Sequence, residues 1–198
     1  MKTIMDILTP GNIQFMIFTG AKYSLLLAIG ALFFGVILGI IGAALKLSKH
    51  FVLRAIGNVY VEIFRGTPML LQIMFLYLAV PTVIQSFTGQ RFQADPYVCG
   101  LIAMSLNSGA YQVELIRSGI LGVDKGQWEA CETIGLNYVQ TMRYVILPQA
   151  FKRIIPPLIS EFITLIKDSS LIFTIGAVEL LATASVIGAN TFNYLVPL

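Results

Sequence analysis

The chain has 198 residues, of which 57% are hydrophobic and only 12% charged, and its mean hydropathy is +0.81. A soluble globular domain carries about 25% charged residues, so this composition excludes an ordinary water-soluble protein and indicates the bilayer as its solvent. The net charge of +3 comes without a dense Lys/Arg patch, which argues against nucleic-acid binding.

Five apolar stretches, each near the ~20 residues that a membrane span needs, follow one another along the chain. They cover residues 23–45, 66–90, 96–113 with a possible extension to 116, a stretch from about 154, and 180–198. We therefore predict an all-α membrane protein, with five transmembrane helices in one domain over residues 1–198. The last stretch has no charged flank after it, so we expect the final helix to be truncated.

Lys and Arg side chains are distributed unevenly between the connectors. Nine of the thirteen lie after the first or the third stretch: Lys46, Lys49, Arg54, Arg65, Arg117, Lys125, Arg143, Lys152 and Arg153. Because cytoplasmic loops are enriched in these residues, we expect both connectors inside and the N-terminus outside.

The connector after the third stretch is too regular for a simple loop. Residues 127–134 read as a helix, with acidic residues in the first turn where the helix dipole favours them. Gly135 offers a stop through a positive φ, and a second helical piece runs to Pro148, which is expected to end or kink it. The sequence predicts a helix–turn–helix over about 126–149.

A spaced motif in this connector carries a family resemblance. It consists of Glu129-Ala130-Cys131, three residues, Gly135, nine residues, and Val145-Ile146-Leu147-Pro148. This resembles the Glu-Ala-Ala loop of ABC-importer permeases, with departures at Cys131 and Val145. Further segments resemble the polar amino-acid branch of that family (histidine, arginine and glutamine types): 62–68 with Gln72, 110–119 with Ser118 in place of Gly, 147–150 and 167–171. The resemblance covers about residues 20–190.

The resemblance implies the permease of a type I importer in the inner membrane. Its partners would be two cytoplasmic ATPase subunits, a second permease that is identical or related, and an extracellular binding protein. Residues 127–135 would form the coupling helix between the third and fourth spans. The residues implied in coupling are Gln127, Glu129, Ala130, Gly135, Leu147 and Pro148.

No enzyme motif is present in the sequence. There is no Gly-rich phosphate loop followed by Lys and Ser/Thr, and no hydrolase or dinucleotide signature. Cys99 and Cys131 match no metal-ligand spacing, and we expect both to be small buried residues. We therefore expect a transport subunit without a cofactor or metal of its own, with ATP and Mg²⁺ bound by the partner ATPase.

Polar residues inside the apolar stretches are the candidate substrate contacts. An acid in a membrane span usually faces a cavity or a partner, and Glu161 and Asp168 share a helical face because they are seven residues apart. Asn107, Tyr111 and Glu114 share a face of the third span and are expected to converge on the same cavity, and Gln72 belongs to the second span. Two acids favour cationic amino acids, but they can equally bind the α-amino group that all amino acids share, or stabilise the fold.

Two other patterns have structural interpretations. Glu62 with Arg65 and Glu114 with Arg117 are three residues apart and can pair on a helix. Gly35, Gly39 and Gly42 are spaced to allow close helix packing.

Other functions are also open at this stage. A secondary transporter or channel would use an intramembrane acid as an ion site, but it would not need the cytoplasmic helix–turn–helix. The chain lacks the motifs of a membrane enzyme, and a purely structural subunit would have little reason to keep Glu161 in a membrane span.

Overall fold

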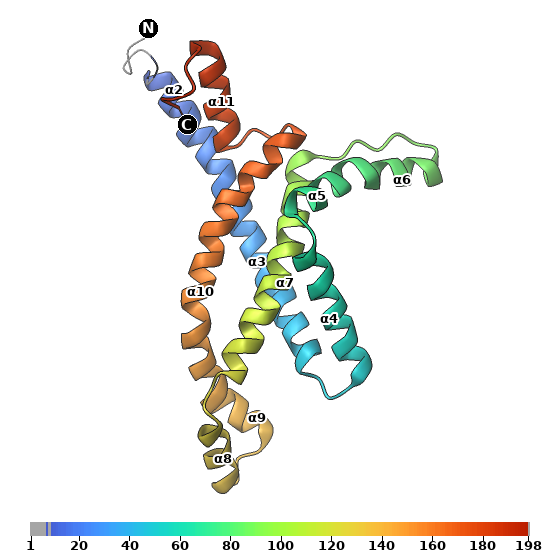
Figure 1. The fold of residues 1–198 in the computed structure, drawn as a ribbon, viewed down its shortest axis with the longest axis vertical. Helices are drawn as coiled ribbons and strands as arrows, with labels where there is room; N and C mark the ends of the chain where they lie inside the picture. Colours follow the sequence, from blue (N-terminus) through green and yellow to red (C-terminus); the bar gives the residue numbers. More distant parts are fainter. Residues whose placement is uncertain (1–6, 8, 198) are drawn as a thin grey trace.

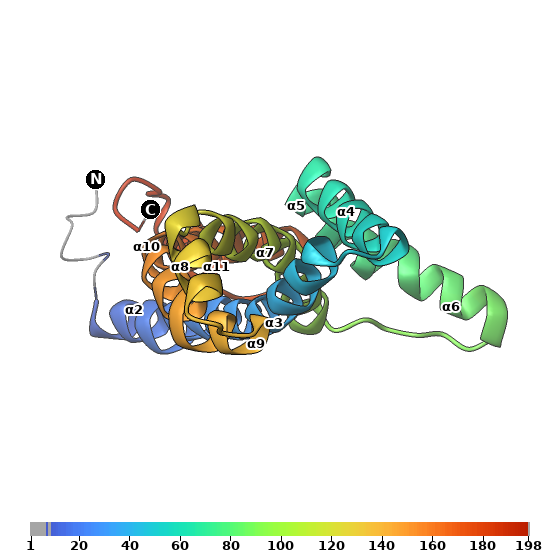
Figure 2. The same ribbon diagram turned by 90° about the horizontal axis from the view of Figure 1, so that it is seen from below.

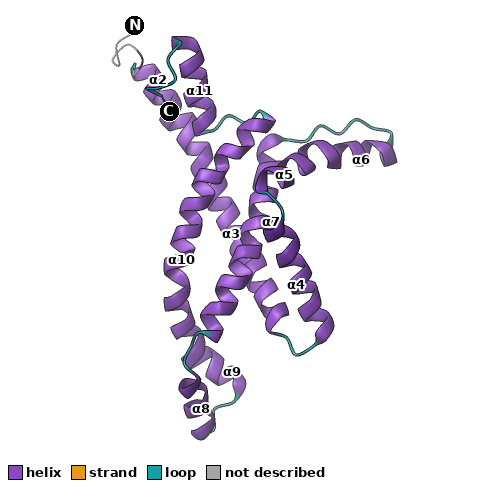
Figure 3. Ribbon diagram, in the orientation of Figure 1, coloured by secondary structure: helices purple, strands orange, loops and turns teal. Residues whose placement is uncertain are grey.

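The structure is a computed structural model that describes residue 7 and residues 9–197. Every regular element in this part is helical (Figure 3), which confirms the all-α prediction. The helices are α2 (Pro10–Gln14), η1 (Phe15–Ala21), α3 (Lys22–Leu47), α4 (Phe51–Gly66), α5 (Met69–Met74), η2 (Phe75–Ala79), α6 (Val80–Thr88), α7 (Pro96–Leu121), α8 (Lys125–Thr133), α9 (Tyr138–Thr141), η3 (Met142–Ile146), α10 (Leu147–Asp168), η4 (Ser169–Ile175) and α11 (Leu180–Thr191). Residues 1–6, residue 8 and Leu198 lie outside the described part. The prediction that the N-terminus is outside the cell concerns those first residues.

Helices α3 and α7 pack closely at the centre of the molecule, with α10 on one side and α4 on the other (Figures 1 and 2). Glycines make this approach possible. A Cβ atom at Gly39 would lie 2.7 Å from Cβ of Gln112, and one at Gly42 would overlap Cγ2 of Val113. The predicted packing role of these glycines is confirmed.

Helix α4 was expected to belong to a connector, and here the structure differs from the sequence interpretation. Its residues form a helix that packs along α3 and α7, so the connector after α3 shrinks to residues 48–50. The polar residues of α4 gather on one side of the helix, and a stretch that is apolar on its other faces can pack as well as a continuous apolar run.

The second apolar stretch forms α5, η2 and α6, which end at Gly89 in a left-handed conformation with φ of 70°. This arm extends away from the central helices (Figures 1 and 2). Many of its large side chains are exposed, among them Leu71, Phe75, Leu78 and Phe87. Such a surface suits contact with lipid or with another apolar chain.

Helix α10 begins at Leu147, earlier than expected, and Pro156 and Pro157 lie inside it. The fifth stretch forms only α11, which ends where Phe192 adopts a positive φ of 55°. The N-cap of α11 is Glu179, which is 1% exposed and accepts hydrogen bonds from the backbone N–H groups of Leu181 and Ala182.

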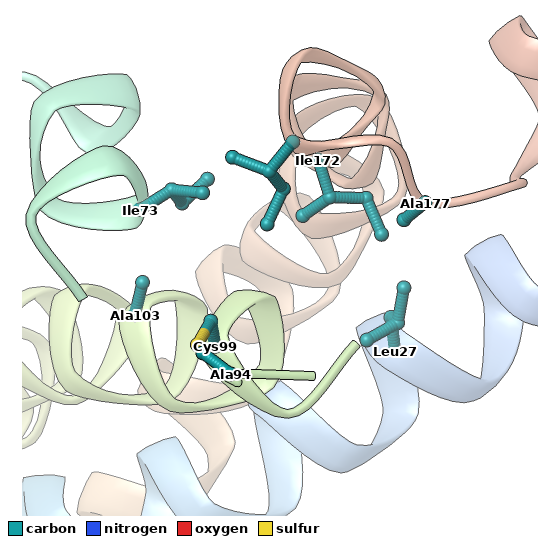
Figure 4. Close-up of a cluster of buried hydrophobic side chains, with 8 residues drawn as sticks. Leu27, Ile73, Ala94, Cys99, Ala103, Ile172 and Ala177 are labelled. Carbon is teal, nitrogen blue, oxygen red and sulfur yellow. The ribbon is translucent and has the colours of Figure 1, made fainter. Parts of the chain in front are cut away.

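Two apolar clusters hold the ends of the bundle together. In the first, Leu27, Ile73, Cys99 and Ile172 bring α3, α5, α7 and η4 into contact (Figure 4). At the opposite end, a second cluster joins α7 to η3 and α10, with Trp128 of α8 packed against it. Both cysteines are buried and free, as expected.

Two described helical segments are long and apolar enough to cross a bilayer, Pro10–Leu47 and Met69–Thr88. The bent pair Tyr138–Ile175 and Leu180–Thr191 adds a third if it counts as one span. Helix α7 has 26 residues, but many are small or polar. The five-span count therefore stays a prediction.

Candidate functional site

A cavity of about 520 Å³ lies where four helices meet. Its lining comes from the junction of α4 and α5, from α7 and from α10. The lining residues are Arg65, Gly66, Thr67, Pro68, Met69, Asn107, Tyr111, Glu161, Thr164 and Asp168. Four of the five residues expected from the sequence to contact a substrate are thus brought together, and Gln72 is not among them.

The junction of α4 and α5 is a break imposed by Pro68. The residue before a proline is disfavoured in the α conformation, and Thr67 is extended with φ −118° and ψ 143°. The side-chain Nε2 of Gln72 donates to the carbonyl oxygen of Phe64 at 2.9 Å and to the hydroxyl of Thr67 at 2.8 Å. Gln72 therefore satisfies backbone groups left free at the end of α4, and it sits behind the cavity wall.

Asn107 links α7 to the same junction. Its Nδ2 donates to the carbonyl oxygen of Phe64 at 2.8 Å and to Oε1 of Gln72 at 3.2 Å. The side chain is 6% exposed, so its amide hydrogens are committed to the wall while the residue still borders the cavity. Its geometry favours positioning of Arg65 and Thr67, and a direct substrate contact by Asn107 stays a prediction.

The two acids of α10 line the cavity from the other side. Glu161 and Asp168 are both half-buried, and Thr164 lies between them on the same face. Glu161 faces Ser108 of α7, whose fully buried hydroxyl accepts a hydrogen bond from Nε2 of Gln112 at 3.0 Å. Ser108 belongs to the part of α7 that packs closely against Gly35 of α3.

Arg65 lines the cavity, although the sequence did not indicate it as a substrate contact. It was expected to pair with Glu62, but the described part of the chain contains no ion pair between them. Its Cζ atom instead lies 4.9 Å from the centroid of the Tyr111 ring, a cation–π arrangement. The Thr67-Pro68 dipeptide in the sequence could have indicated this position. It ends α4 and so places Arg65 in the last turn of that helix, at the edge of the cavity.

The second expected pair is present and extends into a cluster. Nε of Arg117 lies 3.0 Å from Oε2 of Glu114, and Nζ of Lys46 pairs with Oε1 of the same carboxylate. Glu114 therefore joins the last turn of α3 to α7. It does not line the cavity.

The expected helix–turn–helix is present as α8, a turn, and α9. Asp124 caps α8 by accepting from the N–H of Gly126, so Glu129 lies in the middle of the helix and not in its first turn. Glu129 and Ala130 are exposed, and Gly135 has a φ of 77°, as predicted for the stop. Gln127 accepts a hydrogen bond from Gln149 at 2.9 Å, which ties α8 to the start of α10.

The path from α9 into α10 is continuous. Asn137 and Gln140 form a capping box at the start of α9, and the π-helical turn η3 leads directly into α10 at Leu147. Pro148 is accommodated in the first turn of α10, where a missing N–H costs little, and it does not end the helix. Leu147 and Pro148 are exposed.

The chain is similar to known transport proteins over most of its length. The family described as "Binding-protein-dependent transport system inner membrane component" matches residues 35–197. The putative glutamine transport system permease protein GlnP of Rickettsia conorii is 40% identical over 93% of this chain and 82% of its own. The arginine permease ArtQ and the L-cystine permease TcyB of Bacillus subtilis are 39% and 44% identical, over 92% and 88% of this chain and 80% and 71% of their own.

Two solved structures of ABC transporters are also similar to this chain. The crystal structure of an amino acid ABC transporter with histidines superposes with a TM-score of 0.85 and 34% identity, over 98% of this chain and 87% of that one. The MetNI methionine ABC transporter in an inward-facing conformation shares the fold, with a TM-score of 0.72 and 17% identity over 96% of this chain and 88% of that one. From the family match and these relatives, the chain belongs to the binding-protein-dependent transport system inner membrane components.

Proposed function

We propose that this chain is the permease subunit of an ATP-driven importer, and that its cavity binds the amino acid in transit. One observation carries the proposal: a polar cavity inside an apolar helical bundle has acids on one wall and a guanidinium on the other. The names of the relatives, which are glutamine, arginine and cystine permeases, support an amino acid as the cargo.

The charge arrangement suits the two groups that every amino acid carries. The carboxylates of Glu161 and Asp168 can accept hydrogen bonds from an α-ammonium group. The guanidinium of Arg65 can donate two parallel hydrogen bonds to an α-carboxylate. Held over the Tyr111 ring, Arg65 keeps its planar group oriented towards the cavity.

The substrate class follows from this balance. A preference for basic amino acids was suggested by two acids alone, but Arg65 offsets part of their charge, and the relatives are not confined to basic substrates. We therefore propose recognition of the shared amino-acid backbone by the cavity, with the preference among side chains not set by Glu161 and Asp168.

Coupling to ATP is the second part of the proposal. Helix α8, with Glu129 and Ala130 exposed, would insert into a cleft of the ATPase subunit, and the turn at Gly135 would connect this movement to α10. ATP and Mg²⁺ would be bound by the ATPase subunits. A second permease, identical or related, and an extracellular binding protein would complete the assembly.

The membrane arrangement belongs to the same proposal. Five spans would place α8 and α9 in the cytoplasm and the N-terminus outside. The excess of Lys and Arg at the α8–α9 end supports this orientation.

Uptake into proteoliposomes tests the proposed function. The complex of permeases and ATPase is reconstituted with its binding protein, and uptake of labelled glutamine, arginine and cystine is measured with ATP or with a non-hydrolysable analogue. We expect saturable uptake of at least one amino acid with ATP alone. Uptake that instead follows a proton or sodium gradient and ignores ATP would contradict the proposal and favour a secondary transporter.

A further inference from the structure

Helix α4 carries a polar stripe along one side. Arg54, Asn58, Glu62 and Arg65 are spaced by four, four and three residues. At about 100° per residue, these positions fall within an arc of about 80°. The three charged members are exposed and Asn58 is half-buried, so the stripe is an accessible face that borders the packed side of the helix.

The other two faces of α4 differ sharply from this stripe. Gly57 and Val61 are buried where the helix meets its neighbours. A Cβ atom at Gly57 would lie 3.3 Å from the carbonyl oxygen of Gly42, so this face touches α3. The third face is apolar and exposed, with Val52, Ile56, Val59 and Ile63 each more than half exposed.

Helix α4, and the stripe with it, runs from the last turn of α3 to the middle of α7. Gly57 lies beside Lys46 in the last turn of α3, while the Tyr60 hydroxyl donates to the carbonyl of Leu106 at 2.7 Å, near the middle of α7. The upper end of the stripe, Arg65, lines the cavity. The N-terminal end of α4 lies at the same end of the molecule as α8 and α9 (Figure 1).

The charges of the stripe need water. Within the described part of the chain, neither Arg54 nor Glu62 takes part in an ion pair. Ionised side chains beside a membrane span are strongly disfavoured against lipid and face a water-filled cavity or a partner. The adjacent apolar face, with Val52 and Ile56, has the composition that lipid requires, so the two faces meet different surroundings.

We propose that the polar stripe of α4 lines the water-filled path by which the amino acid leaves the cavity towards the α8–α9 end. This rests on the proposed function, because the cargo is the amino acid bound in the cavity. Along the path the charges alternate from Arg65 to Glu62 to Arg54. The carboxylate of the amino acid can therefore pair with an arginine, and its ammonium group with Glu62, at successive steps. No cluster of like charges along the path would hold the amino acid tightly.

Cysteine reactivity on the two exposed faces tests this directly. In a background with Cys99→Ala and Cys131→Ala, single cysteines replace Arg54, Asn58 or Glu62 on the stripe and, as matched controls on the same helix, Val52, Ile56 or Val59. The assembled complex in liposomes is treated with a charged, bilayer-impermeant methanethiosulfonate. Because only the thiolate reacts and it needs water to form, we expect the stripe to react at least about tenfold faster than the controls.

The outcomes separate this inference from the proposed function. Equal rates on the two faces, or faster reaction at the apolar positions, would overturn it. So would an unreactive stripe that instead cross-links to the second permease, because the stripe would then be an interface. A reactive stripe in a complex that takes up no amino acid would keep the water path and overturn the proposed function. A stripe that does not react, in a complex that does take up an amino acid, would overturn the water path and keep the proposed function.

Discussion

Arg65 and Tyr111, from two different helices, face each other at the edge of the cavity, with the guanidinium carbon 4.9 Å from the ring centroid. This contact orients a charge that has no carboxylate partner among the described residues. A guanidinium held in this way remains available to a carboxylate that enters the cavity.

Replacement of Arg65 is therefore expected to weaken amino-acid binding. Arg65→Ala removes a charge-assisted pair of hydrogen bonds and should raise the Kd by about 10- to 100-fold. Arg65→Lys keeps the charge but loses the planar fork, so its effect should be intermediate. Equilibrium binding to the assembled complex measures both, with Arg91→Ala, in the exposed connector after α6, as the control. Binding by Arg65→Ala as tight as wild type would remove Arg65 from the site.

The packing of α3 on α7 predicts a steric effect of one methyl group. In Gly39→Ala the new Cβ would lie 2.7 Å from Cβ of Gln112, an atom next to the backbone that cannot move aside. Overpacking of this kind costs about 1–3 kcal/mol, so the thermal midpoint of the purified complex should fall. Gly11→Ala is the matched control, because a Cβ there meets nothing within 4 Å. Similar midpoints for the two variants would contradict the close approach.

The Lys46–Glu114–Arg117 cluster predicts energetic coupling between α3 and α7. Glu114→Gln removes both ion pairs and leaves Lys46, whose side chain is 15% exposed, without its partner. A double-mutant cycle with Lys46→Met should give a coupling energy of about 1–2 kcal/mol, within the range for groups in direct contact. Chemical or thermal unfolding of the four complexes provides the values. Additive effects would show that the pair contributes nothing to stability.

The proposed coupling role predicts a difference between two acids of α8. Glu129 and Glu132 are both exposed on the same helix, but only Glu129 belongs to the spaced motif. Glu129→Ala should lower ATP-driven uptake by about tenfold, an energetic change of about 1.4 kcal/mol, while Glu132→Ala should have little effect. ATP hydrolysis and uptake are measured in the same proteoliposomes. Equal losses would mean that any acid on α8 serves, and the motif position would lose its special role.

The sequence was sufficient for the long helices and for most of the cavity. Apolar runs located α3 and α7, and the seven-residue spacing placed Glu161 and Asp168 on one face. Helix α4 was missed because its charges were counted as those of a loop, although they occupy one narrow arc. The roles of Gln72 and Arg65 depend on the break at Pro68, which is visible in the sequence. They also depend on the position of α7 beside that break, which no local pattern reveals. Glu179 shows the same limit, because its capping role depends on where α11 begins.

The central claim is that the cavity binds an amino acid through Glu161. The most direct measurement is equilibrium binding of a labelled amino-acid panel to the purified permease–ATPase complex, with Glu161→Gln and, as a charge-matched control away from the cavity, Glu132→Gln. We predict saturable binding of at least one amino acid, lost in Glu161→Gln and kept in Glu132→Gln, with all complexes still assembled. An assembled complex that binds no amino acid, or a Glu161→Gln variant that binds as well as wild type, would contradict the account and return Glu161 to a structural role.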